Sequence, residues 1–140
     1  MTTATDGPGA HPAANNAMIT AILHATLLSA DLARSRAFYE GVLGLQPDPR
    51  RPDLGFDGVW YDVAPGQQIH LMRLPDPEVG LPRPLHGGHD RHVALAVSDV
   101  AALAEKLDQA GTGCTLSSSG RKALFCRDPD GNALEFIESI

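Results

Sequence analysis

The chain has 140 residues and a mass of 14.8 kDa, the size of one ordinary domain that can bury its own core. Its composition, 43% hydrophobic and 20% charged, is typical of a globular protein, and its net charge of -6 provides no attraction to nucleic acid or anionic lipid. We expect a single-domain protein that binds neither nucleic acid nor membrane. Since no export signal is evident at the N-terminus, we expect it to act in the cytoplasm.

The first half of the chain predicts one strand, one helix and three further strands. Residues 1–19 are small, polar and turn-forming, so we expect a flexible tail that includes His11, ahead of a domain at 20–140. Asp31 is suited to the N-cap of a helix that ends before Gly44. Apolar and β-tolerant residues predict strands on either side of this helix, at 22–28, 45–47, 56–63 and 68–74.

The same order of elements is predicted again after a connector. Residues 75–89 contain four prolines and three glycines without apolar periodicity, which is typical of a loop. Asp99 and Gly111 then bound a second predicted helix, with strands at 91–98, 113–116, 121–127 and 133–138. The prediction is an α+β fold of two βαβββ modules, 20–74 and 90–139.

Four side chains that can bind a metal occupy matching positions in the two halves. In each half a histidine on the first strand precedes the helix N-cap by seven residues, and these are His24 and His92. His70 and Glu135 lie on the last predicted strand of each half. A single histidine on a strand is usually a hydrogen-bonded core or rim residue, but three histidines and one glutamate in matching positions predict a shared metal site.

Imidazole and carboxylate donors suit Zn, Ni, Mn, Co or Fe, and the sequence leaves the choice open. Four protein ligands leave two positions of an octahedron for a substrate, which is a catalytic arrangement. Gln68 shares the strand face of His70 and is the alternative ligand there. His86 and His89 lie in the connector and are expected to be solvated, with His89 a secondary candidate for the rim of the site.

The chain resembles the vicinal oxygen chelate superfamily, which includes glyoxalase I, bleomycin-resistance proteins, fosfomycin-resistance thiol transferases and extradiol dioxygenases. The resemblance covers about residues 20–139 and is carried by Phe38-Tyr39 through Val42-Leu43-Gly44-Leu45 and by Asp128-Pro129-Asp130-Gly131-Asn132 with Leu134-Glu135-Phe136. It implies a cupped eight-stranded mixed sheet with the metal inside the cup, held by His24, His70, His92 and Glu135. His70 departs from glyoxalase I, which has a glutamate on that strand.

The leading hypothesis is a metal-dependent lyase or isomerase of the glyoxalase type, in which the ion chelates neighbouring oxygens of a small substrate and Glu135 acts as the base. One alternative is an extradiol-type Fe(II) dioxygenase that uses His24, His92 and Glu135. Another is a fosfomycin-type thiol transferase. The third is a metal-free, bleomycin-resistance-like protein that binds a drug in a cleft lined by aromatic residues, namely Phe56, Trp60, Tyr61 and Phe125.

Substrate contacts are predicted for the aromatic and cationic residues near these strands. The candidates are Trp60, Arg73, Arg91, Arg121 and Phe125. If the protein is a thiol transferase, Lys122 is a further candidate for binding an anionic substrate. Relatives commonly form homodimers, so we expect a homodimer, in which 50–55 and the connector are candidates for the contact.

Overall fold

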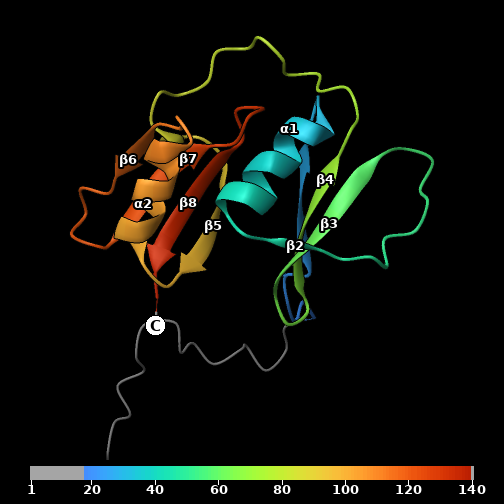
Figure 1. The fold of residues 1–140 in the computed structure, drawn as a ribbon, viewed down its shortest axis with the longest axis horizontal. Coiled ribbons are helices and arrows are strands. Elements are labelled where there is room, and N and C mark those ends of the chain that lie inside the picture. The colour runs from blue at the N-terminus through green and yellow to red at the C-terminus, as the bar shows by residue number, and fades with distance from the viewer. Residues whose placement is uncertain (1–17, 140) are drawn as a thin grey trace, which may run out of the picture.

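The two halves of the chain form two four-stranded sheets that repeat the same order of elements (Figure 1). The structure is a computed structural model that describes residues 18–139. Most of the predicted tail, 1–17 with His11, lies outside the described residues, and Met18 and Ile19 are exposed and belong to no helix or strand.

The first sheet has the strand order β1-β4-β3-β2. β1 runs parallel to β4, while β3 is antiparallel to both β4 and β2. Residues 69 and 71 of β4 are buried, and residues 68, 70 and 72 on its other face are only partly buried. The elements of this module are β1 (His24–Leu28), α1 (Leu32–Arg36), η1 (Ala37–Val42), β2 (Gln46–Pro47), β3 (Gly58–Ala64) and β4 (Gln67–Met72).

The second sheet has the equivalent order β5-β8-β7-β6, with β5 parallel to β8. The predicted α+β fold with two βαβββ modules is therefore confirmed, and its eight strands are hydrogen-bonded as two sheets of four within the described part of the chain. The connector contains one short 3-10 helix, η2. The elements here are η2 (Gly87–His89), β5 (His92–Val97), α2 (Val100–Gln109), β6 (Cys114–Leu116), β7 (Ala123–Arg127) and β8 (Ala133–Glu138).

The helices begin where the sequence predicts. The side chain of Asp31 accepts a hydrogen bond from the backbone N–H of Arg34 at 3.1 Å, and Asp99 caps α2 in the same way. Gly44 follows the first helix with φ of +75°, a conformation that other residues rarely adopt. No helix among residues 18–139 is long and apolar enough to cross a membrane.

The first helix differs from the prediction in its second half, because α1 passes into the π-helix η1. The backbone N–H of Leu43 donates to the carbonyl of Phe38, five residues earlier. A π turn is wider than an α turn and separates adjacent residues by a smaller angle. Both Phe38 and Tyr39, which are adjacent in sequence, are therefore buried in the core.

One hydrophobic core contains residues from both modules, and buried polar contacts join them. The hydroxyl of Tyr39 donates to the Asp128 carboxylate at 2.7 Å, and both side chains are buried. The amide of Asn132 donates to the Leu28 carbonyl at 3.2 Å. The turn at 128–131 of the second module is thus fixed against the first module.

Candidate metal and substrate site

The register of the two sheets places the four predicted ligands in equivalent positions. On the parallel pair β1/β4, His24 lies opposite Gln68, two residues before His70. On the parallel pair β5/β8, His92 lies opposite Ala133, two residues before Glu135. Each module therefore presents its first histidine beside the predicted ligand of its last strand.

The same register extends to an aromatic residue on the neighbouring strand. Trp60 on β3 lies directly opposite His70, and Phe125 on β7 lies directly opposite Glu135. Because side chains directly opposite each other in an antiparallel pair point to the same face, each predicted ligand has an aromatic neighbour. Each module therefore repeats three equivalent positions: the histidine on the first strand, the proposed ligand on the last strand and the aromatic residue opposite that ligand.

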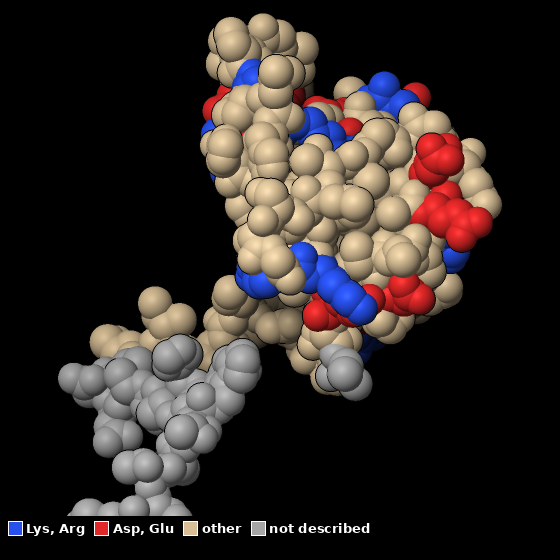
Figure 2. Space-filling view, turned by 90° about the vertical axis from the view of Figure 1, so that its left-hand side faces the viewer, with Lys and Arg blue, Asp and Glu red and all other residues tan. Residues whose placement is uncertain are grey.

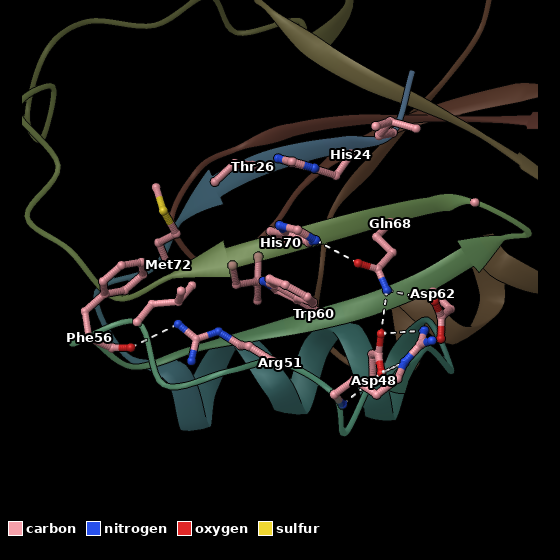
Figure 3. Close-up of a pocket in the computed structure, with 15 residues that line it drawn as sticks. His24, Thr26, Asp48, Arg51, Phe56, Trp60, Asp62, Gln68, His70 and Met72 are labelled. Carbon is pink, nitrogen blue, oxygen red and sulfur yellow. Dashed lines mark hydrogen bonds and ion pairs between the residues drawn. The ribbon is translucent and has the colours of Figure 1, made fainter. Parts of the chain in front are cut away.

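In the first module the imidazole rings of His24 and His70 stack on each other (Figure 3). The rings of His24 and His70 lie 4.1 Å apart between centroids, with an interplanar angle of 12°. Trp60 stacks on the other face of His70 at 4.4 Å and 6°. Burial is the main cause that lowers the pKa of His70, and the neighbouring His24 lowers it further. This ring is therefore neutral at neutral pH and has a lone pair for a cation.

In the second module the histidine and the carboxylate face each other. Nε2 of His92 lies 3.3 Å from Oε1 of Glu135, and Nη2 of Arg121 lies 3.3 Å from its Oε2. Glu135 is only 5% exposed. A buried carboxylate normally accepts hydrogen bonds near 2.9 Å. The two contacts of 3.3 Å are weaker, so they only partly offset the cost of removing the Glu135 carboxylate from water.

One chain brings the predicted ligands together as two pairs. Within residues 18–139, no group of three or more His, Cys, Asp or Glu side chains is arranged to hold a metal. A cavity of about 760 Å³ lies over His24, Trp60 and His70, and all the residues that line it belong to the first module. The cavity over the first pair therefore contains neither His92 nor Glu135 of the same chain.

The donor atoms of the second pair fit a divalent ion. Two donors held ~2.1 Å from one ion are separated by ~3.0 Å at a right angle and ~3.4 Å at a tetrahedral angle, which brackets the 3.3 Å between His92 and Glu135. Nδ1 of His92 lies 2.8 Å from the carbonyl oxygen of Asp90. A carbonyl only accepts, so Nδ1 carries the proton and Nε2 keeps the lone pair that a ligand needs.

The first pair fits an ion through its chemistry, but its rings are nearly parallel. Parallel rings direct their in-plane lone pairs along parallel planes, so one ring has to turn about its side-chain bonds before both can contact a shared ion. His24 is exposed and has room to turn, whereas His70 is held between two rings. His24 is thus the adjustable member of the pair.

Hydrogen bonds extend from His70 through Gln68 to polar residues that no sequence pattern indicates. Gln68, predicted only as an alternative ligand, accepts from Nε2 of His70 at 2.8 Å, and its amide nitrogen donates to Asp48 at 2.8 Å and Asp62 at 2.9 Å (Figure 3). Arg50 donates two side-chain hydrogen bonds to Asp48 and holds the pKa of that carboxyl well below its usual range. We refer to Gln68, Asp48, Asp62 and Arg50 as the Gln68 network.

The predicted substrate-binding residues divide into two groups. Trp60, Arg121 and Phe125 lie against the proposed ligands, since the Phe125 ring meets His92 edge-on at 5.7 Å. Arg73 and Arg91 instead form ion pairs with Asp57 and Glu78, respectively. Lys122 forms an ion pair with Glu138 at 3.4 Å.

The connector histidines lie nearer to the second pair than a solvated loop implies. His86 stacks with His89 at 4.8 Å between centroids and packs against Phe125 at 4.9 Å, while Phe125 also contacts His92. His86 is half-buried and His89 is exposed. Of the two, His86 is the one that packs against Phe125, the aromatic neighbour of His92 and Glu135. The composition of the connector alone does not indicate this position.

Comparisons with known proteins identify the family and the fold of the chain. A model of the Glyoxalase/Bleomycin resistance protein/Dioxygenase superfamily matches residues 21–136. A lactoylglutathione lyase from Haemophilus influenzae is 30% identical over 125 residues, which cover 84% of this chain and 92% of that protein. The fold is shared with the solved lactoylglutathione lyase of Agrobacterium tumefaciens, with a TM-score of 0.61 at 22% identity, covering 88% of this chain and 96% of that chain. It is also shared with an antibiotic-binding protein from Streptomyces, with a TM-score of 0.66 at 16% identity and coverage of 89% and 99%.

Proposed function

Since the chain belongs to the Glyoxalase/Bleomycin resistance protein/Dioxygenase superfamily, we propose that it is a metal-dependent lyase or isomerase acting on a small substrate with two neighbouring oxygens. The observation that supports this proposal best is the equivalent register of the two pairs, His24 with His70 and His92 with Glu135. The ion would be Zn, Ni, Mn, Co or Fe.

The complete site is proposed to form between two copies of the chain. His24 and His70 of one copy would bind the ion together with the partner's His92 and the partner's Glu135. A second copy is proposed because residues 18–139 of one chain bring the donors together only as pairs, and because the cavity over the first pair is lined by the first module alone. The symmetric dimer would contain two such sites.

The surfaces beside the two pairs support this assembly. Among the residues that the structure describes, β1 and β5 each have one strand neighbour, so each sheet has an edge strand that carries a proposed ligand. An unpaired edge strand is suited to contact with another copy. Leu23 and Leu54 at the first cavity are 66% and 47% exposed. Figure 2 shows the side of the molecule at the left of Figure 1, which belongs to the second module, and there charged side chains gather toward the edges and leave the middle largely uncharged.

The residues have separate roles in the proposed reaction. A bound divalent ion would polarise two neighbouring substrate oxygens and stabilise the negative charge that develops on them. Glu135 takes a proton from one of the carbons that carry these oxygens and returns it to the other, so the overall change is an isomerisation that needs no oxidant. Arg121, 3.3 Å from Glu135 and largely exposed, contacts an anionic group of the substrate.

The proposal is tested on the purified full chain. Its metal content is measured first, and the metal-free protein is then loaded with nickel, zinc, cobalt or manganese. The name of the Haemophilus relative suggests the substrate, the hemithioacetal of methylglyoxal and glutathione, whose isomerisation is followed by the absorbance of the thioester. Thioester formation that requires added metal supports the proposal. If metal-loaded protein forms no thioester and exchanges no α-proton of other hydroxycarbonyl compounds, the proposal is wrong.

A second function, binding of a planar aromatic ligand without metal, is favoured by the stacked rings in the first module. The exposed ring of His24 ends a stack of three rings, with His70 and Trp60 behind it, on the wall of a 760 Å³ cavity. A planar ligand can extend such a stack. Protein isolated without metal that binds an aromatic antibiotic equally well before and after metal loading would favour this function.

A further inference from the structure

The Gln68 network lies beside the proposed site, but its counterpart is missing from the second module. Gln68 occupies the position opposite His24, and the residue opposite His92 is Ala133, which has no polar side-chain atoms. The amide is therefore not required by the fold that the two modules share. Its hydrogen bonds connect one proposed ligand, His70, to a buried carboxylate, Asp48.

The two carboxylates determine how the Gln68 amide is oriented. Its Nε2 lies 2.8 Å from Oδ2 of Asp48 and 2.9 Å from Oδ1 of Asp62. An ionised carboxylate only accepts hydrogen bonds, so the NH₂ end has to face them. Turning the amide over would place its oxygen against two carboxylates and lose both hydrogen bonds. The oxygen Oε1 therefore faces His70.

This orientation determines the role of each nitrogen of His70. Oε1 of Gln68 can only accept, and it lies 2.8 Å from Nε2 of His70, so Nε2 has to donate. A neutral imidazole carries one proton, which leaves the lone pair on Nδ1. We propose that Gln68 is a positioning residue that holds the His70 proton on Nε2, so that His70 offers Nδ1 to a bound ion.

Asp48 makes this arrangement rigid. Arg50 donates to Oδ1 through Nε at 2.9 Å and to Oδ2 through Nη2 at 3.0 Å, and its backbone N–H also donates to Oδ1. Trp60 and His24 cover the two faces of the His70 ring and restrict its rotation. A histidine that binds a metal usually donates its other N–H to such a fixed acceptor, and loss of that acceptor typically weakens metal binding by about 10–100-fold.

The inference rests on the proposed function for its metal part, but the hydrogen bond is tested without metal. The imidazole N–H protons of the metal-free protein are observed by NMR at about pH 8, where neutral imidazole prevails. We expect a resolved Nε2–H resonance for His70. Gln68→Leu should remove it. Gln67→Leu changes the exposed neighbouring glutamine and should have no effect.

The Nδ1–H of His92, which donates to the Asp90 carbonyl, serves as an internal reference that shows each variant is folded. With zinc added, ¹⁵N shifts identify the nitrogen of His70 that binds the ion. We expect Nδ1, and a loss of about 10–100-fold in zinc affinity for Gln68→Leu.

Four results test the two proposals. Absence of the His70 resonance while that of His92 is present would overturn the inference, as would zinc bound through Nε2 of His70. A wild-type protein that shows the His70 resonance but binds no metal would refute the proposed function and support the role of Gln68. Both proposals are supported if the resonance is present and zinc binds through Nδ1.

Discussion

The hydroxyl of Tyr39 links the first module to the second, and its removal gives a quantitative test of the fold. Tyr39 is fully buried and its hydroxyl donates at 2.7 Å to Asp128, which is 5% exposed. A hydrogen bond to a charged group contributes about 1.5–3 kcal/mol. Asp128 keeps three other donors, the backbone N–H groups of Asp130 and Asn132 and the Asn132 amide, so the lower part of this range applies. We expect Tyr39→Phe to lower the free energy of unfolding by about 2 kcal/mol and Tm by roughly 8 °C.

Tyr61→Phe is the matched control. The hydroxyl of Tyr61 donates at 2.8 Å to Glu40, which is half-buried and also bound by Arg36. Because water can replace this donor, we expect a loss of about 1 kcal/mol or less. Urea unfolding followed by circular dichroism measures both variants. Equal losses for the two, or a loss of less than about 0.5 kcal/mol for Tyr39→Phe, would refute the importance of the link.

The pH dependence of this variant has a defined sign. Burial raises the pKa of Asp128, and the Tyr39 hydroxyl is the largest of the contacts that lower it. Tyr39→Phe should therefore raise this pKa further. The cost of the substitution should be greatest near neutral pH, where Asp128 is ionised, and should decrease as pH falls through the raised pKa. A cost that stays constant between about pH 7 and pH 4 would show that the ionised carboxylate is not involved.

Three further predictions concern single residues near the sheets. Burial raises the pKa of the Cys126 thiol to about 12, so at about pH 8 iodoacetamide should modify exposed Cys114 in the folded protein and Cys126 only after unfolding, as measured by mass spectrometry. Glu135→Gln should weaken zinc binding, measured by calorimetry, by more than about 100-fold, while Glu105→Gln at an exposed position should leave it unchanged. Similar zinc affinities for the two variants would show that Glu135 is not a ligand. Trp60 is the single tryptophan of the chain and stacks on His70, so bound nickel should quench its fluorescence, and unchanged emission at saturating nickel would place the ion elsewhere.

The strands and helix ends could be predicted because local patterns determine them. Asp31 and Asp99 cap their helices as predicted, and residues that alternate along β4 separate the buried face from the face of His70. The π-helix was not predictable, because the hydrogen bond from Leu43 to Phe38 arises from packing two adjacent aromatic residues into one core.

Sequence spacing placed the four proposed ligands on the first and last strands of the two modules, and the register shows that their paired positions are equivalent. It could not predict that one chain holds two separate pairs, because this depends on how the modules pack. The Gln68 network could not be predicted either, because Asp48 lies in a loop 20 residues before Gln68 and no periodic pattern connects the two. The apolar character of cysteine predicts that Cys114 and Cys126 lie in the core. Cys126 is buried, but Cys114 is exposed on β6, which is exposed along its whole length.

Mixing two inactive variants tests most directly whether two copies share the metal site. His24→Ala removes a ligand from the first module, and Glu135→Ala removes one from the second. If each site combines the first module of one copy with the second module of its partner, a mixed dimer has one site with both changes and one intact site. Random mixing makes half of the dimers mixed, so an equal mixture should bind metal tightly at about a quarter of the wild-type sites. A mixture that stays as inactive as the separate variants, although native mass spectrometry shows mixed dimers, would contradict the shared site.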